Sequence, residues 1–106
     1  AKEVYIAPQV RSYIVDVVKR TRGKEEISLG ASPRASIAIS KGSRARALIK
    51  GRPYVLPDDV KYLASRVLNH RLVLSASARN QELSIDSVVG NLLEETPIPE
   101  RSPRLS

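Results

Sequence analysis

The sequence predicts an all-α fold, a small bundle of four helices. The chain has 106 residues, a length that supports one hydrophobic core and not two. Apolar residues recur at three- and four-residue spacing in four separate segments, which is the periodicity of helices with one buried face. Serine, proline and glycine stand at the ends of these segments, where helices start and stop. The only aromatic residues are four tyrosines, so we expect an aliphatic core.

The first helix is predicted over residues 8–22. Pro8 suits a first helical turn, and the apolar stripe behind it is formed by Val10, Tyr13, Ile14, Val17, Val18 and Thr21. Residues 1–7 are short and mixed, and we expect a connector or an edge strand there. Residues 23–31 are predicted as a loop.

The second helix, over residues 33–50, has the clearest start in the chain. Ser32 is a favoured N-cap, and Pro33 suits the first helical position. Gly51 marks its C-terminal end. Gly42 in its interior costs the helix about 1 kcal/mol relative to alanine; the close approach of another backbone and simple sequence drift are the two explanations.

The third helix is predicted from Pro57 to about Arg71. Asp58 and Asp59 lie in its first turn, where acidic residues are favourable. This placement explains the paired acids better than a metal site does. Its core-facing stripe is formed by Val60, Leu63, Ala64, Val67 and Leu68.

The last helix begins after Ser84, which is a favoured N-cap, and ends before the prolines at 97 and 99. Residues 72–74 are predicted to be extended and residues 75–83 to form an exposed loop. Residues 100–106 are expected to be a flexible C-terminal tail.

The composition excludes several chemistries. Without cysteine and with a single histidine, the chain holds no disulfide, thiol nucleophile or zinc finger, and no metal site is expected. No apolar run is long enough to cross a bilayer. Since no nucleophile, base and orienting group come together, we expect no catalytic residues. The absence of methionine suggests an excised or processed part of a longer protein.

The positive charge is concentrated in the first half of the chain. Residues 1–52 contain 12 Lys and Arg against 4 Asp and Glu, a net charge of +8, whereas the whole chain carries +7. The densest cluster is Lys41, Arg44, Arg46, Lys50 and Arg52. A basic half leaves open an independent helical module that binds nucleic acid; a solvated helix face and a protein-interaction bundle are the simpler alternatives.

Arg34 breaks the pattern of the predicted helix over residues 33–50. On a helical wheel, Arg34 and Lys41 fall within the apolar arc, which we expect to face the core. That arc consists of Ile37, Ala38, Ala45, Leu48 and Ile49. Arg34 also lies in the first turn, where the helix dipole disfavours a cation. Two interpretations stay open: Arg34 reaches a phosphate or carboxylate, or its stem packs on the core and its head extends toward Glu25 or Glu26.

The remaining polar and aromatic candidates have structural explanations. Arg46 and Lys50 fall on the opposite, polar side of the second helix and are expected to be ordinary surface cations. His70 is predicted to cap the third helix. Tyr54 and Tyr62 are predicted to be core residues with hydrogen-bonded hydroxyls.

Several motifs together resemble the C-terminal helical lid of MoxR-type AAA+ ATPases. The resemblance covers roughly residues 8–99. It is carried by YIVD at 13–16, TR at 21–22, LGASPRA at 29–35, RARAL at 44–48, GRPYV at 51–55, PDDV at 57–60 and LNHRL at 68–72.

The resemblance implies a role for Arg34. Within the GASPRA sequence, Arg34 is similar to a sensor 2 arginine, which would contact the γ-phosphate of ATP bound to a separate core. Lys41 stands at a position that is usually basic in the family, and is a weaker nucleotide-binding candidate. ATP and Mg²⁺ would belong to the full-length parent, with none bound to this segment alone.

The resemblance also implies partners and an organisation. Residues 1–7 would connect the lid to an AAA+ core, because this chain carries no phosphate-binding loop of its own. The parent would be a cytoplasmic, chaperone-like ATPase that forms a ring, commonly a hexamer, and works with proteins carrying von Willebrand factor A domains. The lid would then couple ATP binding and hydrolysis to the remodelling of those partners.

Overall fold

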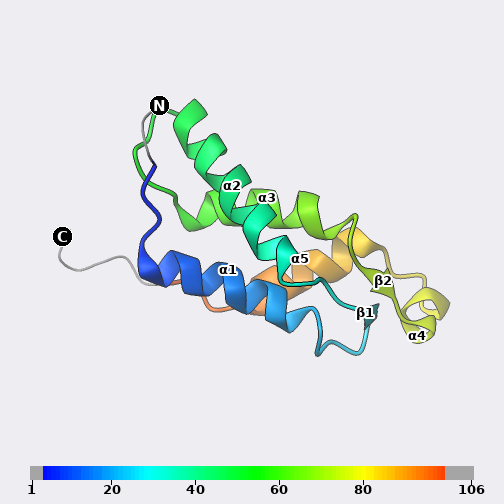
Figure 1. Cartoon of the computed structure of the whole chain (residues 1–106). Helices are drawn as coiled ribbons and strands as arrows, with labels where there is room; N and C mark the ends of the chain where they lie inside the picture. The colour runs from blue at the N-terminus through cyan, green and yellow to red at the C-terminus, as the bar shows by residue number, and fades with distance from the viewer. Residues whose placement is uncertain (1–3, 100–106) are drawn as a thin grey trace.

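The structure is a computed structural model that describes residues 4–99, and within them it has five helices and one short sheet (Figure 1). The chain is mostly helical, as expected, but the all-α four-helix prediction is confirmed only in part, because a fifth helix and a two-stranded sheet are also present. The elements are α1 (Pro8–Arg20), β1 (Ile27–Leu29), α2 (Arg34–Ile49), α3 (Pro57–Leu68), β2 (Val73–Leu74), α4 (Ala76–Asn80) and α5 (Ile85–Glu95). The predicted tail at 100–106 lies outside the described residues.

The sheet occupies two segments whose pairing was not predicted. β1 and β2 are antiparallel, with Ile27 opposite Leu74 and Leu29 opposite Val73. The extended conformation expected at 72–74 is confirmed, whereas β1 lies in the predicted loop over 23–31. A strand this short shows no alternation of its own, and its partner is far along the chain.

The fifth helix, α4, lies in the predicted loop over 75–83. Ser75 caps it by accepting a hydrogen bond from the backbone N–H of Ala78 at 3.1 Å. Because the helix has only five residues, it is too short for a helical apolar stripe to be visible in the sequence. The predicted cap at Ser84 is confirmed, since its hydroxyl accepts from the N–H of Ser87 at 3.0 Å.

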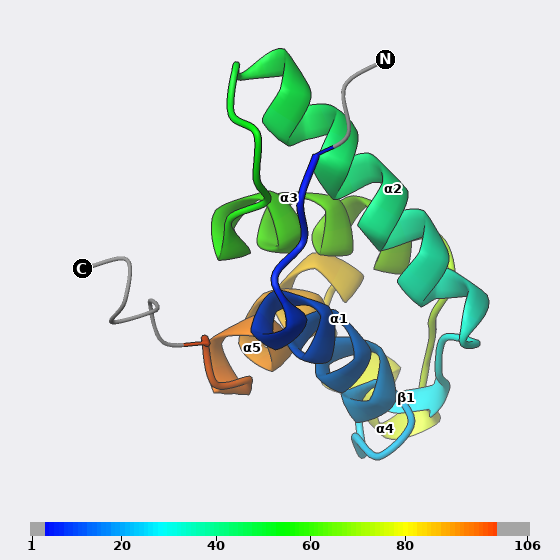
Figure 2. The ribbon, with the colours of Figure 1, turned by 60° about the vertical axis from the view of Figure 1, so that its left-hand side comes forward.

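The core is aliphatic, as the composition predicts. In Figure 2, α1 and α5 lie side by side in the lower part of the view, and α2 and α3 lie above them. The largest fully buried apolar side chains are Ile14, Ile39, Leu68 and Leu92. These four residues come from α1, α2, α3 and α5, so every long helix contributes to a single core.

α2 presents the opposite face to the core from the one that the helical wheel predicts. Its buried residues are Ala35, Ile39, Ser43 and Ala47. The predicted core residues Ile37 and Leu48 are 58% and 51% exposed. Small residues carry little weight in a hydrophobic pattern, yet they are the ones that allow a close approach. A Cβ added to Gly42 would lie 2.8 Å from Leu63 Cγ, so this glycine makes room for a side chain of α3 and not for another backbone.

A buried carboxylate joins α2, α3 and the segment between them. Asp59 is fully buried and lies 2.8 Å from Arg46 Nη1. Arg52 donates two hydrogen bonds to the same carboxylate, at 2.7 and 2.8 Å, and the backbone N–H of Leu56 donates a further one at 2.8 Å. The first-turn capping role of Asp59 is therefore confirmed. Arg46 as an ordinary surface cation is wrong, because its side of α2 faces α3.

This network predicts a stability that depends on acid. Burial raises the pKa of Asp59, but the hydrogen bonds from Arg52, Leu56 and Arg46 outweigh it and lower the pKa from 3.8 to about 2. The unfolded chain therefore takes up the proton first, and about 2 kcal/mol of stability present above pH 4 is expected to disappear as the pH falls toward 2. Urea unfolding across this range measures the loss. Asp59→Asn should be less stable at neutral pH and should show a smaller loss; equal losses in both proteins would contradict the prediction.

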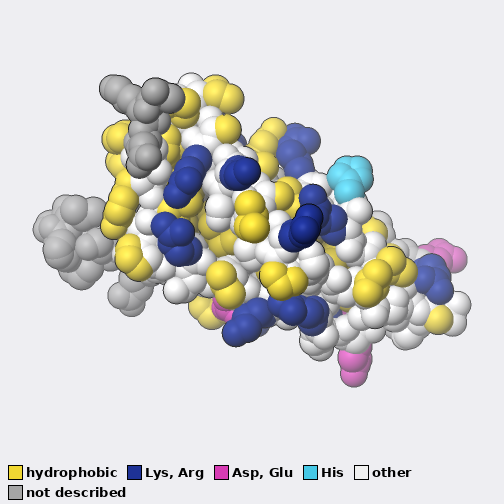
Figure 3. Space-filling model, viewed as in Figure 1, with side chains coloured by type: hydrophobic (Ala, Val, Ile, Leu, Met, Phe, Trp, Pro, Cys, Tyr) yellow, Lys and Arg dark blue, Asp and Glu magenta, His cyan; other side chains and the backbone are white. Residues whose placement is uncertain are grey.

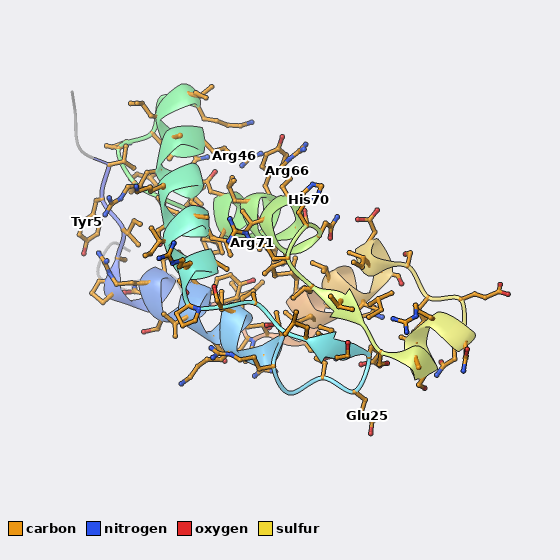
Figure 4. All side chains as sticks on the ribbon, turned by 45° about the vertical axis from the view of Figure 1, so that its right-hand side comes forward. Tyr5, Glu25, Arg46, Arg66, His70 and Arg71 are labelled. Carbon is orange, nitrogen blue, oxygen red and sulfur yellow. The ribbon has the colours of Figure 1, made fainter. Side chains whose placement is uncertain are left out.

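The two tyrosines predicted as core residues lie at the surface. Tyr54 is 46% exposed and Tyr62 is 43% exposed. The ring of Tyr62 lies between two guanidinium groups, those of Arg46 and Arg66, each 4.4 Å from its centroid. Figure 4 shows these two arginines close together above α3. Their contact with the ring is a cation–π arrangement, in which Arg46 comes from α2 and Arg66 from α3, the helix that carries Tyr62.

The segment before α1 is tied to the loop between α2 and α3. Val4 and Ile6 are buried, and Tyr5 forms a parallel bridge with Tyr54. The N–H of Tyr5 donates to the carbonyl of Pro53, and the N–H of Val55 donates to the carbonyl of Tyr5, both at 2.9 Å. This segment therefore enters the domain along the same loop that supplies Arg52 to Asp59.

Candidate functional site

Arg34 lies at the start of α2 with its side chain exposed. The helix begins at Arg34, one residue later than predicted. Ser32 still acts there, because its hydroxyl accepts a hydrogen bond from the N–H of Arg34 at 3.2 Å and its carbonyl accepts from the N–H of Ala35 at 2.9 Å. Ala35 is fully buried. The helix start is thus fixed on one side by packing, and Arg34 projects from the other.

The loop before Arg34 is fastened to the C-terminal end of α1. The N–H of Ala31 donates to Thr21 Oγ1 at 2.9 Å, and Ala31 is buried. A Cβ on Gly30 would lie 2.8 Å from the carbonyl oxygen of Thr21. The absence of a side chain on Gly30 therefore allows the loop to lie directly against α1. The sequence places Thr21 on the apolar stripe of the first helix and in the TR motif at 21–22 but indicates no contact for it; a polar residue on that stripe is the signal that points to one.

Among residues 4–99, no carboxylate lies within ion-pair distance of Arg34. Glu25 projects away from the rest of the chain on the loop before β1 (Figure 4). The alternative in which Arg34 pairs with Glu25 or Glu26 is therefore not observed. In this structure the guanidinium is directed to the outside of the domain without an acidic partner among the described residues.

Lys41 shares the outward face of α2 with Arg34. Both side chains are exposed, and they lie on the same side as Ile37 and Leu48. The sequence prediction grouped these residues correctly but placed the group toward the core, and that orientation is wrong. On the side of the molecule seen in Figure 3, basic side chains lie among hydrophobic ones over α1 and α2. Acidic side chains appear only near the lower edge and at the far end.

The other candidates do not assemble into a site. His70 is exposed just beyond the end of α3. Within the part of the chain that the structure describes, no three acidic or histidine side chains gather as a metal-binding group. No helix in that part has the length and apolar character needed to span a membrane. Of the basic cluster, Arg46 and Arg52 are held by Asp59, so nucleic-acid binding stays a prediction that no structural observation favours.

Comparison with known proteins identifies the family. The family model described as AAA lid domain matches residues 19–91. The chain belongs to the AAA lid domain family. The lid is 39% identical over 97 residues to chaperone MoxR1 of Mycobacterium tuberculosis, covering 83% of the lid and 26% of that protein. It is 38% identical over 90 residues to uncharacterized protein YeaC of Bacillus subtilis, covering 85% of the lid and 28% of that protein. These matches place it with the lids of MoxR-type AAA+ ATPases.

A solved structure supports the same assignment. The crystal structure of a candidate ATPase from Cytophaga hutchinsonii superposes with a TM-score of 0.85 at 31% sequence identity. The match covers 92% of the lid and 32% of that chain. The lid thus spans about a quarter to a third of the length of these similar proteins.

Proposed function

We propose that this lid couples ATP binding and hydrolysis in a separate AAA+ core to the remodelling of partner proteins, with Arg34 as its sensor 2 arginine. The observation that carries the proposal is the exposed, outward-directed guanidinium of Arg34, which has no acidic partner among the described residues. Arginine presents a permanently charged planar group that suits phosphate oxygens. The resemblance of residues 29–35 to the GASPRA motif gives this cation its target, the γ-phosphate.

A guanidinium directed to the γ-phosphate favours the arrangement in which the lid is closed on the core. Loss of that phosphate on hydrolysis removes the contact, and the population returns to the open arrangement. The same group stabilises the negative charge of the transferring phosphoryl group. ATP and Mg²⁺ are accordingly cofactors of the whole ATPase, and Arg34 is the principal ligand that the lid supplies to the nucleotide.

The outward face of α2 is the surface that this proposal places against the core. Ile37, Leu48 and Ile49 are 58%, 51% and 83% exposed, an apolar face along the helix that begins with Arg34. The similar proteins are about three to four times longer than the lid, which supplies a partner within one polypeptide. Lys41 lies in the middle of this face, as a second basic group for the nucleotide.

We also propose an organisation for the whole ATPase, based on the resemblance to the family. We take residues 1–7 as the connector from the core, residues 8–99 as the lid and residues 100–106 as a tail. A ring of subunits, commonly six, in the cytoplasm would carry out chaperone-like remodelling; the similar protein MoxR1 of M. tuberculosis is named a chaperone. Proteins with von Willebrand factor A domains are the proposed partners.

The test is the substitution Arg34→Ala in the ATPase that contains this lid. We expect ATP turnover to fall at least about tenfold, equivalent to about 1.4 kcal/mol of transition-state stabilisation. The unfolding midpoint should stay the same, because the side chain is exposed. Arg11→Ala, which removes an exposed arginine from the far end of α1, is the matched control. Equal turnover by the two variants would refute the sensor 2 assignment.

A further inference from the structure

The geometry points to Thr21 as a positioning residue that holds Arg34 in place for the nucleotide. This inference rests on the proposed function, and concerns how the lid keeps its arginine in register. Thr21 is fully buried although it is polar. Its hydroxyl donates to the carbonyl of Val18 at 2.7 Å and accepts from the N–H of Ala31 at 2.9 Å. One side chain therefore joins the last turn of α1 to the loop before α2.

The hydroxyl has no substitute in this position. Burial of a polar backbone group without a partner costs free energy, and the N–H of Ala31 would lose its partner if Oγ1 were removed. Gly30, which lies against the Thr21 carbonyl, keeps the loop close enough for the bond to form. The bond and the close approach act at the same point, three and four residues before Arg34.

This attachment determines where α2 starts and therefore where Arg34 lies. α2 starts immediately beyond the fastened loop, and the buried Ala35 fixes its rotation at that end. With Ala31 held on α1, the position of Arg34 relative to the rest of the domain is set from two sides. Displacing a catalytic contact by about 1 Å can reduce a rate by as much as a hundredfold. Thr21 thus acts on turnover only through Arg34.

The test is turnover by Thr21→Val, which keeps the shape of the side chain and removes the hydroxyl. In the ATPase that contains the lid, we expect kcat to fall about fivefold while KM stays within about twofold, since positioning affects the rate step. Thr21→Ser retains the hydroxyl and should restore kcat. In an Arg34→Ala background, Thr21→Val should have no further effect, because the two residues act through one contact.

The matched control is Thr96→Val at the end of α5. Thr96 is also buried, and its hydroxyl makes the same kind of bond to Leu92 at 2.7 Å, but it accepts no hydrogen bond from another segment within the described residues. Its replacement should leave kcat within about twofold. Hydrogen exchange gives a readout independent of turnover: the amide of Ala31 should exchange faster in Thr21→Val and not in Thr96→Val.

Each result bears on one of the two proposals. If Arg34→Ala lowers turnover and Thr21→Val does not, the positioning role is overturned and the sensor 2 role stands. If Thr21→Val slows the enzyme equally with and without Arg34, Thr21 acts on the fold in general and the inference is also overturned. If Arg34→Ala has no effect, the proposed function fails and the positioning role fails with it.

Discussion

Replacing Asp59 by alanine is expected to lower the free energy of unfolding of the lid by about 3 kcal/mol, within the range measured when one partner of a buried ion pair is removed. The carboxylate is fully buried and is the common partner of Arg46 and Arg52. Its loss leaves two guanidinium groups beside each other without their counter-charge. The N–H of Leu56 at the start of α3, which donates a hydrogen bond to Asp59, also loses its capping acceptor.

Urea unfolding followed by circular dichroism measures this loss. Asp58→Ala is the matched control, because it removes an exposed carboxylate one residue earlier in the same helical turn. That change should cost no more than about 0.5 kcal/mol through the helix dipole. If the two variants unfold at the same urea concentration, the ion network is not a major support of the fold.

Ile39→Ala is expected to lower the free energy of unfolding by about 2–5 kcal/mol, the usual cost of truncating a buried isoleucine. Ile39 is fully buried, with 0% of its surface accessible to solvent. The other buried residues of α2 are alanine and serine, so Ile39 supplies the largest side chain by which this helix enters the core. A cavity left there has small neighbours and a close helix beside it, which limits its collapse.

Ile37→Ala, two residues earlier, tests which face of α2 packs on the core: the one in the structure or the one that the helical wheel predicts. In the lid alone, this change should alter stability by less than about 0.5 kcal/mol because the side chain is exposed. The helical wheel of the sequence predicts the reverse, with Ile37 in the core. Thermal unfolding of both variants decides the matter, and a larger loss for Ile37→Ala would refute the orientation of α2 in the structure.

Local signals in the sequence predict the four long helices well, but not the five-residue α4. The starts at Pro57 and Ser84 depend on capping and on proline geometry, which involve only neighbouring residues. The pairing of β1 with β2 depends on a distant partner, and no local signal reveals it. The face of α2 was mispredicted for a different reason: the core accepts small residues where helices approach closely, and the larger apolar residues Ile37 and Leu48 are left on the outside.

The candidate site also has one part that the sequence predicts and another that only the structure shows. Arg34 was identified because a cation in a first helical turn is unfavourable on its own, a conflict visible in the sequence. Its attachment through Thr21 and Gly30 is visible only in the structure, because Thr21 lies before β1 in the sequence and Gly30 lies after it. The nucleotide-binding roles of Arg34 and Lys41 stay predictions, and the substitution of Arg34 tests the first of them.

α1 connects two attachment points at a fixed distance from each other. At one end, the chain entering it is bonded to the loop at Pro53 and Val55. At the other end, Thr21 holds Ala31. The 13 residues between these ends span about 20 Å at the helical rise of 1.5 Å per residue. We therefore expect a rotation of the segment before α1 to move the loop before Arg34 as well, because α1 connects the two as one rigid helix.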